Sequence, residues 1–208
     1  MNKRSLIFAA FALTGIIASA ATVAQPPSGE PNFFLTATGS GNGGDLGGLA
    51  GADAICQSQA DAAGLDGTFR AYLSTQGSNA VNARDRIGEG PWFNVQGARV
   101  AANVEELHSL NHRVGASSAL TATGNRIPGS GFSPNRHDVL TGSQADGTAY
   151  PPGEDMTCNN WTSSSEDGTA RVGHHDWPNW NSAHNSQGCT QQNLINTGGD
   201  GLFFCFAQ

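Results

Sequence analysis

The sequence has almost no lysine. Its 208 residues include ten basic and 17 acidic residues, and Lys3 is the one lysine. If an N-terminal leader containing Lys3 and Arg4 is removed, eight arginines face 17 carboxylates, a net charge of −9 with histidine neutral. Phosphate backbones and sulphated glycans repel such a chain. We therefore expect no nucleic-acid partner, and the acidic balance argues against heparin.

Long apolar runs are equally scarce. The one clear run, residues 6–20, follows the basic start Asn2-Lys3-Arg4 and is too short for a stable membrane span. Small residues then offer cleavage sites after Ala24 or, alternatively, after Ala20. The sequence predicts a signal peptide over 1–24, a linker over 25–32 and one domain over 33–208. We expect a secreted protein, extracellular or periplasmic, without a membrane span.

The chain lacks a CxxC motif, which argues against a zinc ribbon or a thioredoxin-type site. Four cysteines are present: Cys56, Cys158, Cys189 and Cys205. An even number of cysteines in an exported chain indicates disulfide bonds, and four cysteines allow three pairings. Their spacing alone does not select one of the three.

Local patterns indicate an α+β domain with many turns, because 28 glycines are scattered without a collagen period. The strongest helix signal is the alanine-rich segment 50–63, which Gly64 ends. Strands are expected at 33–38, 69–74, 139–140, 158–163 and 202–207, and short helices at 80–87 and 103–111. Strands at both ends suggest that the termini pair in one sheet.

The segment 52–75, ADAICQSQADAAGLDGTFRAYLST, resembles the start of endostatin, the C-terminal fragment of certain collagens. Further motifs follow in the order of that family: DVLTGS at 138–143, CNNWT at 158–162, Gly188-Cys189 and the ending FFCF at 203–206. The sequence is even more similar to bacterial secreted proteins with an endostatin-like, or C-type-lectin-like, domain. They share LGGLAGAD at 46–53, the segment WNSAH at 180–184 and TGG at 197–199.

The resemblance implies nested disulfides, Cys56–Cys205 and Cys158–Cys189, and a mixed sheet with two helices and long loops. It also makes adhesion plausible, because some spirochaete relatives are adhesins. The zinc site of endostatin, an N-terminal histidine cluster, has no counterpart near Gln25.

The segment 173–184 is the densest group of functional residue types in the chain. If exposed, Trp177 and Trp180 would stack on sugar rings, with Asn179, Asn181 and His184 binding hydroxyl groups. A second interpretation is a zinc site of His174, Asp176 and His184, since imidazole and carboxylate are suitable ligands. A third is purely structural, with the tryptophans packing a long loop onto the disulfide.

Other motifs are weaker. The Trp180-Asn181-Ser182 segment is similar to the Trp-Asn-Asp of calcium-dependent lectins, but serine replaces the aspartate ligand, which argues against calcium. His108 and His112 have helical i, i+4 spacing without the glutamate of a zinc protease. No nucleophile elbow, phosphate loop or dinucleotide fingerprint is present.

We therefore expect a secreted, non-enzymatic binding module, lectin-like or adhesin-like. It would recognise a carbohydrate or an extracellular protein through loops in residues 135–190. The alternatives are a zinc-dependent hydrolase using His174, Asp176 and His184, and a structural protein of an envelope or matrix. No resident cofactor is expected for the binding module.

Overall fold

The computed structural model describes residues 29–208, so the expected signal peptide and residues 25–28 of the linker lie outside the described residues. The described chain is a mixed α+β structure, as expected, and none of its helices has the length and apolar character needed to cross a membrane. Its elements in order are β1 (Phe33–Leu35), α1 (Gly48–Ala63), β2 (Phe69–Ala71), the 3-10 helix η1 (Ala83–Arg86), β3 (Trp92–Phe93), β4 (Arg99–Ala101), α2 (Val104–Leu107), β5 (Asp138–Leu140), α3 (Cys158–Trp161), β6 (Arg171–His174), β7 (His184–Asn185), α4 (Gln191–Thr197), β8 (Gly199–Leu202) and β9 (Phe204–Ala207).

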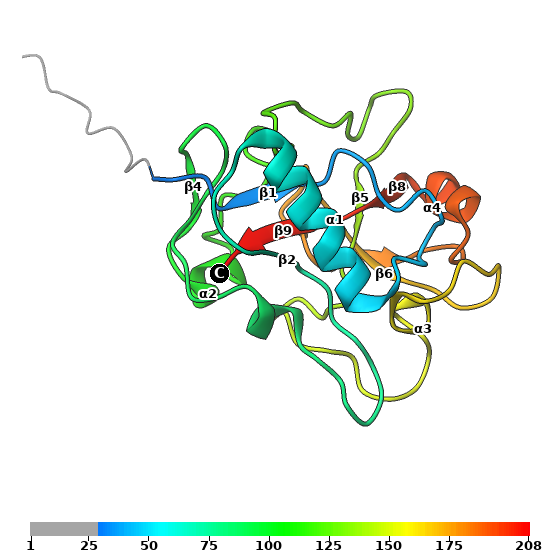
Figure 1. Ribbon diagram of the computed structural model, residues 1–208. Helices are drawn as coiled ribbons and strands as arrows, with labels where there is room; N and C mark the ends of the chain where they lie inside the picture. The colour runs from blue at the N-terminus through cyan, green and yellow to red at the C-terminus, as the bar shows by residue number, and fades with distance from the viewer. Residues whose placement is uncertain (1–28) are drawn as a thin grey trace, which may run out of the picture.

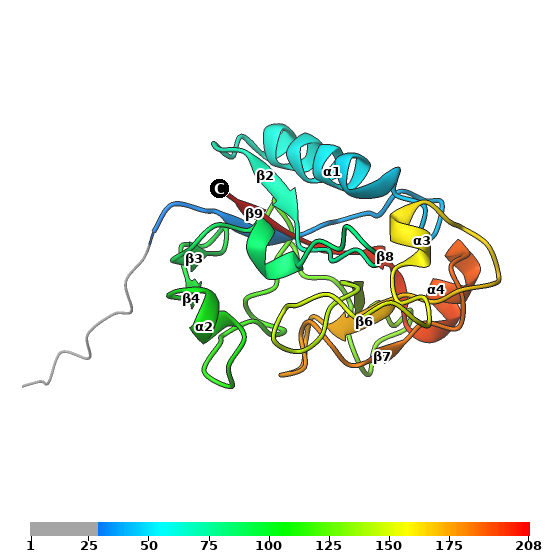
Figure 2. The same ribbon diagram turned by 90° about the horizontal axis from the view of Figure 1, so that it is seen from below.

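Strand β9 is the centre of a three-stranded sheet. It pairs antiparallel with β1 on one side and with β2 on the other. The expectation that the two ends of the domain share a sheet is therefore confirmed. Helix α1 lies across one face of this sheet (Figures 1 and 2).

The alternation of side chains along the central strands creates two cores. Successive residues of a strand point to opposite faces. Cys205 and Phe34 face α1 and join a core that also contains both disulfides. On the opposite face, Phe204 and Phe206 pack with a second, aromatic core whose large members are Phe33, Tyr72, Trp92 and Trp180.

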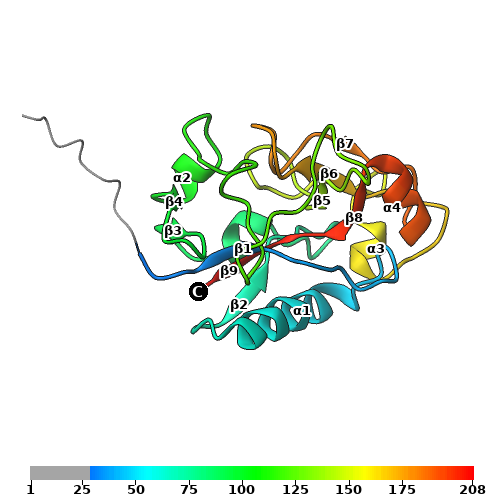
Figure 3. The same ribbon diagram turned by 90° about the horizontal axis from the view of Figure 1, so that it is seen from above.

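A four-stranded sheet has the order β7-β6-β5-β8. Its strands are antiparallel except for the parallel pair β5 and β8, so the sheet is mixed. Only Phe203 separates β8 from β9, and the C-terminal segment 199–207 therefore runs from one sheet into the other (Figure 3). A separate hairpin of β3 and β4 lies with α2 at the other end of the molecule (Figure 3).

The four cysteines form two nested disulfides. Cys56 of α1 bonds to Cys205 of β9, and Cys158 bonds to Cys189, each with 5.6 Å between the Cα atoms. This is the pairing that the resemblance to endostatin implied. Closing the longer loop, of 149 residues, removes about 5 kcal/mol of chain entropy from the unfolded state in the entropic model.

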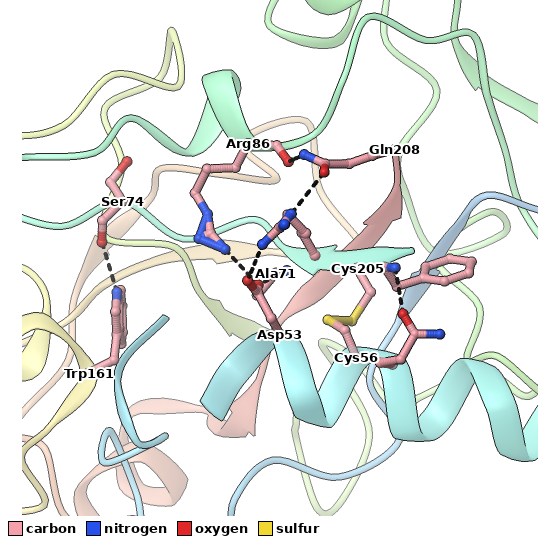
Figure 4. Close-up of polar contacts among 11 residues, drawn as sticks. Asp53, Cys56, Ala71, Ser74, Arg86, Trp161, Cys205 and Gln208 are labelled. Atoms are coloured by element: carbon pink, nitrogen blue, oxygen red, sulfur yellow. Dashed lines mark hydrogen bonds and ion pairs between the residues drawn. A yellow bond between two sulfur atoms is a disulfide. The ribbon is translucent and has the colours of Figure 1, made fainter. Parts of the chain in front are cut away.

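The prediction of a strand at residues 158–163 is wrong. Residues Cys158–Trp161 instead form a single turn, α3, with φ between 46° and 67°, which is left-handed backbone. Asparagine tolerates this conformation better than most residues, and Asn159 and Asn160 occupy its middle. The turn is held by the side chain of Thr157, which accepts a hydrogen bond from the Asn160 N–H. A buried Trp161 also anchors the turn, because its indole N–H donates to the Ser74 carbonyl over 2.8 Å (Figure 4).

The two short helices are shorter than expected. The segment 80–87 contains only η1, and the segment 103–111 contains only α2, which ends at Leu107. His108 follows α2 as its C-cap residue, and His112 lies beyond the helix. The two histidines therefore do not share a helix face.

Asp53 joins α1 to the sheet and to η1. Its carboxylate accepts hydrogen bonds from the guanidinium groups of Arg70 and Arg86 over 2.9 and 2.6 Å, and from the Ala71 N–H over 2.9 Å (Figure 4). The Arg86 side chain is almost fully buried. A buried guanidinium without its carboxylate is costly, so Asp53 fixes the position of α1 on the sheet.

Replacing Asp53 by asparagine should lower the free energy of unfolding by about 3 kcal/mol, because Arg86 would keep a buried charge without a counter-charge. Urea unfolding measures the change. Asp61→Asn, at an exposed position of the same helix, is the matched control and should change stability by about 0.5 kcal/mol or less. Equal effects of the two substitutions would contradict this role of Asp53.

Candidate functional site

Three histidines and one aspartate meet at one end of the four-stranded sheet. Asp138 is the first residue of β5, directly after His137, and His174 is the last residue of β6. The strands run antiparallel with Asp138 opposite His174. His184 starts β7 opposite Val172, two residues before His174 in β6. Residues two apart share a face of a strand, so His174 and His184 lie on the same face.

The side chains of His137, Asp138, His174 and His184 form what we call the histidine–aspartate cluster. The Nε2 atoms of His137, His174 and His184 lie 3.2, 3.3 and 3.5 Å from one oxygen of Asp138, Oδ1. The Nε2 atoms of His174 and His184 are 3.0 Å apart. The rings of His137 and His174 stack with their centroids 4.2 Å apart. Potential metal-ligand atoms of His137, Asp138 and His174 therefore lie within 4.8 Å of one another, and His184 approaches Asp138 and His174 from the side.

Asp138 is the unusual member of the cluster. Its side chain is 3% exposed, yet among residues 29–208 neither carboxylate oxygen accepts a hydrogen bond. The three imidazoles approach Oδ1 without the alignment that an N–H···O bond needs. No arginine in the described chain forms an ion pair with Asp138. A buried carboxylate is expensive unless a cation or several donors compensate its charge.

Asp176 supports the cluster from outside. Its Oδ1 lies 3.4 Å from Nδ1 of His137, the nitrogen opposite the one that faces Asp138. Its Oδ2 accepts a 2.7 Å hydrogen bond from the Ser130 N–H. Asp176 therefore lies beside His137 and ties the segment around Ser130 to the end of the sheet.

The structure changes the membership of the expected zinc set of His174, Asp176 and His184. It brings His174 and His184 together, but it places Asp176 beside His137 instead of among the converging Nε2 atoms. His137 and Asp138 were missed by the sequence analysis. The one signal for them is their position directly at the start of the apolar strand signal at residues 139–140.

His175 lies beside the cluster, next to His174 in the chain. Its side chain is buried, and among the described residues neither ring nitrogen has a hydrogen-bond partner. Burial lowers the pKa of His175 below its usual value, so the neutral ring is favoured. Its backbone N–H donates to the carbonyl of His137 over 2.9 Å, which holds the two loops together.

A cleft with a volume of about 520 Å³ adjoins the cluster, between the segments 126–132 and 175–177. Two aromatic side chains line it, and both are well exposed: Trp177 is 54% exposed and Phe132 69%. Its polar lining comes from Arg126, Ser130 and Asp176. The cleft therefore combines flat apolar surface with a few hydrogen-bonding groups, and it shares Asp176 with the cluster.

The structure corrects the expected roles of Trp180 and Asn181. Trp180 is 1% exposed, and its indole N–H donates to the Leu107 carbonyl over 3.1 Å. Asn181 is also buried and donates to the hydroxyl of Tyr72 over 2.9 Å. Neither side chain is available to a sugar. Asn179 is exposed but does not line the cleft, and its carbonyl accepts a hydrogen bond from the His174 N–H.

The same aromatic core contains His108. The hydroxyl of Tyr72 and Nε2 of His108 are 2.8 Å apart, and His108 Nδ1 contacts the Val104 carbonyl over 2.7 Å. Burial raises the pKa of Tyr72 above its usual range and lowers the pKa of His108. His112 lies apart, with its Nε2 2.9 Å from the Pro178 carbonyl. The two histidines that the sequence places at i, i+4 spacing are thus divided between a core contact and a loop contact.

Neither a search of protein-family models nor a search of curated proteins finds a match for the chain. The function is therefore inferred from the cluster and the cleft.

Trp180→Ala should lower the free energy of unfolding by about 3–5 kcal/mol, because it empties part of the aromatic core. Trp177→Ala should change it by about 0.5 kcal/mol or less, because that side chain is half exposed. Urea unfolding of both variants measures the difference. The reverse order of effects would contradict the division of the two tryptophans between core and cleft.

The ring of His108 should titrate in the folded protein below the ordinary value of about 6.5, and an NMR titration of its ring signals measures this. A depressed pKa means that the unfolded chain binds the proton more tightly. The stability contributed by neutral His108 is therefore present above about pH 6.5 and is lost as the pH falls through its lower folded value. Below pH 6.5 the stability of His108→Gln should fall less steeply than that of the natural chain. A midpoint above the ordinary value would refute the assignment.

Proposed function

We propose that the protein is a secreted, non-enzymatic binding module that recognises a carbohydrate in the cleft between segments 126–132 and 175–177. The observation that carries this proposal is the pairing of two exposed aromatic side chains, Trp177 and Phe132, on one cleft. Large exposed apolar side chains are otherwise few: in the described residues they are Leu110 and Ile195. Apolar surface gathered in a concave site is typical of ligand binding.

The chemistry of the lining fits a sugar. Aromatic faces cover the apolar C–H face of a sugar ring, and polar side chains at the edge bind its hydroxyl groups. Arg126 supplies guanidinium donors, and Asp176 supplies one acceptor oxygen, Oδ2, which also accepts from the Ser130 N–H. One wall comes from residues 126–132, which precede the region 135–190 in which the binding loops were expected.

The charge of the chain favours a neutral ligand. The ten basic residues include Lys3 and Arg4, so residues 29–208 carry eight arginines against 17 carboxylates, a net charge of −9. The resulting field repels polyanions such as nucleic acid and heparin. An uncharged glycan avoids this repulsion.

We propose further that the domain belongs to the endostatin-like, C-type-lectin-like class. The nested disulfides support this, because the resemblance implied that pairing, and so does the sheet formed by the two ends of the domain. Two disulfides also support secretion, since such bonds persist in oxidising compartments. An adhesin-like role toward an extracellular glycan is consistent with both.

The test is a glycan array probed with the folded protein, followed by titration of the best neutral glycan. Trp177→Ala and Phe132→Ala should each weaken that affinity by about tenfold, because each removes a stacking surface. Leu110→Ala is the matched control: Leu110 is 93% exposed and lies outside the cleft, so its loss should leave affinity unchanged.

Four results would overturn the proposal. A folded protein that binds no glycan on the array would do so, as would glycan binding unaffected by either cleft substitution. Binding to an extracellular protein through the same residues would replace the carbohydrate by the other expected partner. A loss of stability without a loss of binding in Trp177→Ala would favour the structural role in an envelope or matrix.

A further inference from the structure

We infer that the histidine–aspartate cluster is a zinc site built on Nε2 of His137 and His174 and Oδ1 of Asp138, with Nε2 of His184, beside His174, as the fourth ligand. This inference goes beyond the proposed sugar binding and does not depend on it. It rests on the distances among these four atoms, the burial of Asp138 and the contacts behind the imidazoles.

The spacing of the four atoms fits a tetrahedral zinc ion. Zinc bonds to histidine nitrogen and carboxylate oxygen are about 2.0–2.2 Å long, which places neighbouring ligand atoms about 3.3 Å apart in a tetrahedron. Oδ1 of Asp138 lies 3.2, 3.3 and 3.5 Å from the three Nε2 atoms. The Nε2 atoms of His174 and His184 are 3.0 Å apart. The ligand atoms of His137, Asp138 and His174 already lie within 4.8 Å of one another, and His184 has to move toward His137 to complete the tetrahedron.

Charge gives an independent argument. The buried carboxylate of Asp138 faces three imidazoles, and among the described residues it accepts no hydrogen bond and contacts no arginine. The nearest guanidinium along the chain, that of Arg136, is already paired with Asp200. A divalent cation held by the four ligands would compensate the charge that the protein leaves uncompensated.

The donor set selects the class of metal. Calcium prefers six to eight oxygen ligands and magnesium prefers oxygen in an octahedron, whereas this cluster offers three imidazoles and one carboxylate. Imidazole suits zinc, copper, iron and nickel, and zinc adopts four-coordinate tetrahedral sites. Calcium, against which the sequence already argued, therefore does not fit this cluster either.

Two of the imidazoles are also supported from behind. Histidine ligands usually present their second nitrogen to a carboxylate or a backbone carbonyl, which fixes the ring. Nδ1 of His184 lies 3.2 Å from the Asn185 carbonyl, and Nδ1 of His137 lies 3.4 Å from Oδ1 of Asp176 without the alignment of a hydrogen bond. Asp176 is thus a positioning residue, in place of the ligand role that the sequence suggested.

A closed set of four protein ligands gives the zinc a structural role. Catalytic zinc sites keep one coordination position for water or substrate, and this cluster supplies four protein donors. The arrangement therefore argues against the zinc-dependent hydrolase. Instead, the ion would join the two walls of the cleft, because His137 follows residues 126–132 and His174 precedes residues 175–177.

The experiment measures zinc in the full chain purified without chelator. Elemental analysis should find one zinc per chain, and a chelator should lower the melting temperature, which added zinc then restores. Cobalt(II) in place of zinc should give the intense visible bands of a tetrahedral site. Absence of zinc together with no shift in melting temperature on zinc addition would overturn the inference.

Variants locate the site. His184→Gln is the main variant, because its side chain is 42% exposed and its replacement leaves the core intact. It should abolish stoichiometric binding, and Asp138→Asn should do the same. Asp176→Asn should weaken zinc affinity by about 10–100-fold, as expected for a residue behind a ligand. His112→Gln, a histidine outside the cluster, is the control and should bind zinc as the natural chain does.

Circular dichroism of each variant shows whether it is folded. A folded His184→Gln or Asp138→Asn protein that keeps one tightly bound zinc would refute the site. Glycan binding is measured separately on the zinc-loaded protein, so failure of the zinc site and failure of the sugar proposal give different results.

Discussion

The C-terminal segment 199–207 is the constraint on which both the core and the site depend. Its first half, β8, pairs with β5 in the sheet that carries the histidine–aspartate cluster. Its second half, β9, pairs with β1 and β2 and is bonded to α1 through Cys205. Because both halves are fixed by backbone hydrogen bonds, the position of Asp138 is set by the same strand that closes the main core. The outer disulfide therefore acts on the site as well as on the fold.

The cluster and the cleft differ in the structure that carries them: the cluster lies at paired strands, and the cleft is formed by loops. The ligand atoms of the cluster come from strand ends, where backbone pairing limits their movement, whereas the aromatic groups of the cleft lie on loops. Asp176 connects the two, since it contacts His137 and also lines the cleft. The loops that form the cleft are thereby attached to the paired strands of the sheet.

The sequence predicted those helices and strands whose formation depends on the residues within and next to the segment itself. The alanine-rich segment ended by Gly64 is α1, and the aromatic segments at both ends are β1 and β9. The left-handed turn α3 was missed because the sequence Cys-Asn-Asn-Trp is equally compatible with a strand until Thr157, Ser74 and the disulfide fix it. The cluster was found only in part, because His137 and Asp138 are almost forty residues from His174 and meet it only through strand pairing. Trp180 was assigned to a binding surface because composition cannot distinguish a buried indole from an exposed one.

The distribution of the four tryptophans has a spectroscopic consequence. Trp92, Trp161 and Trp180 are fully enclosed by protein, and Trp177 alone meets solvent, at the cleft. A water-soluble quencher such as iodide or acrylamide therefore reaches one emitter out of four. Protection of Trp177 fluorescence from the quencher would therefore report whether the cleft is occupied, without an added label.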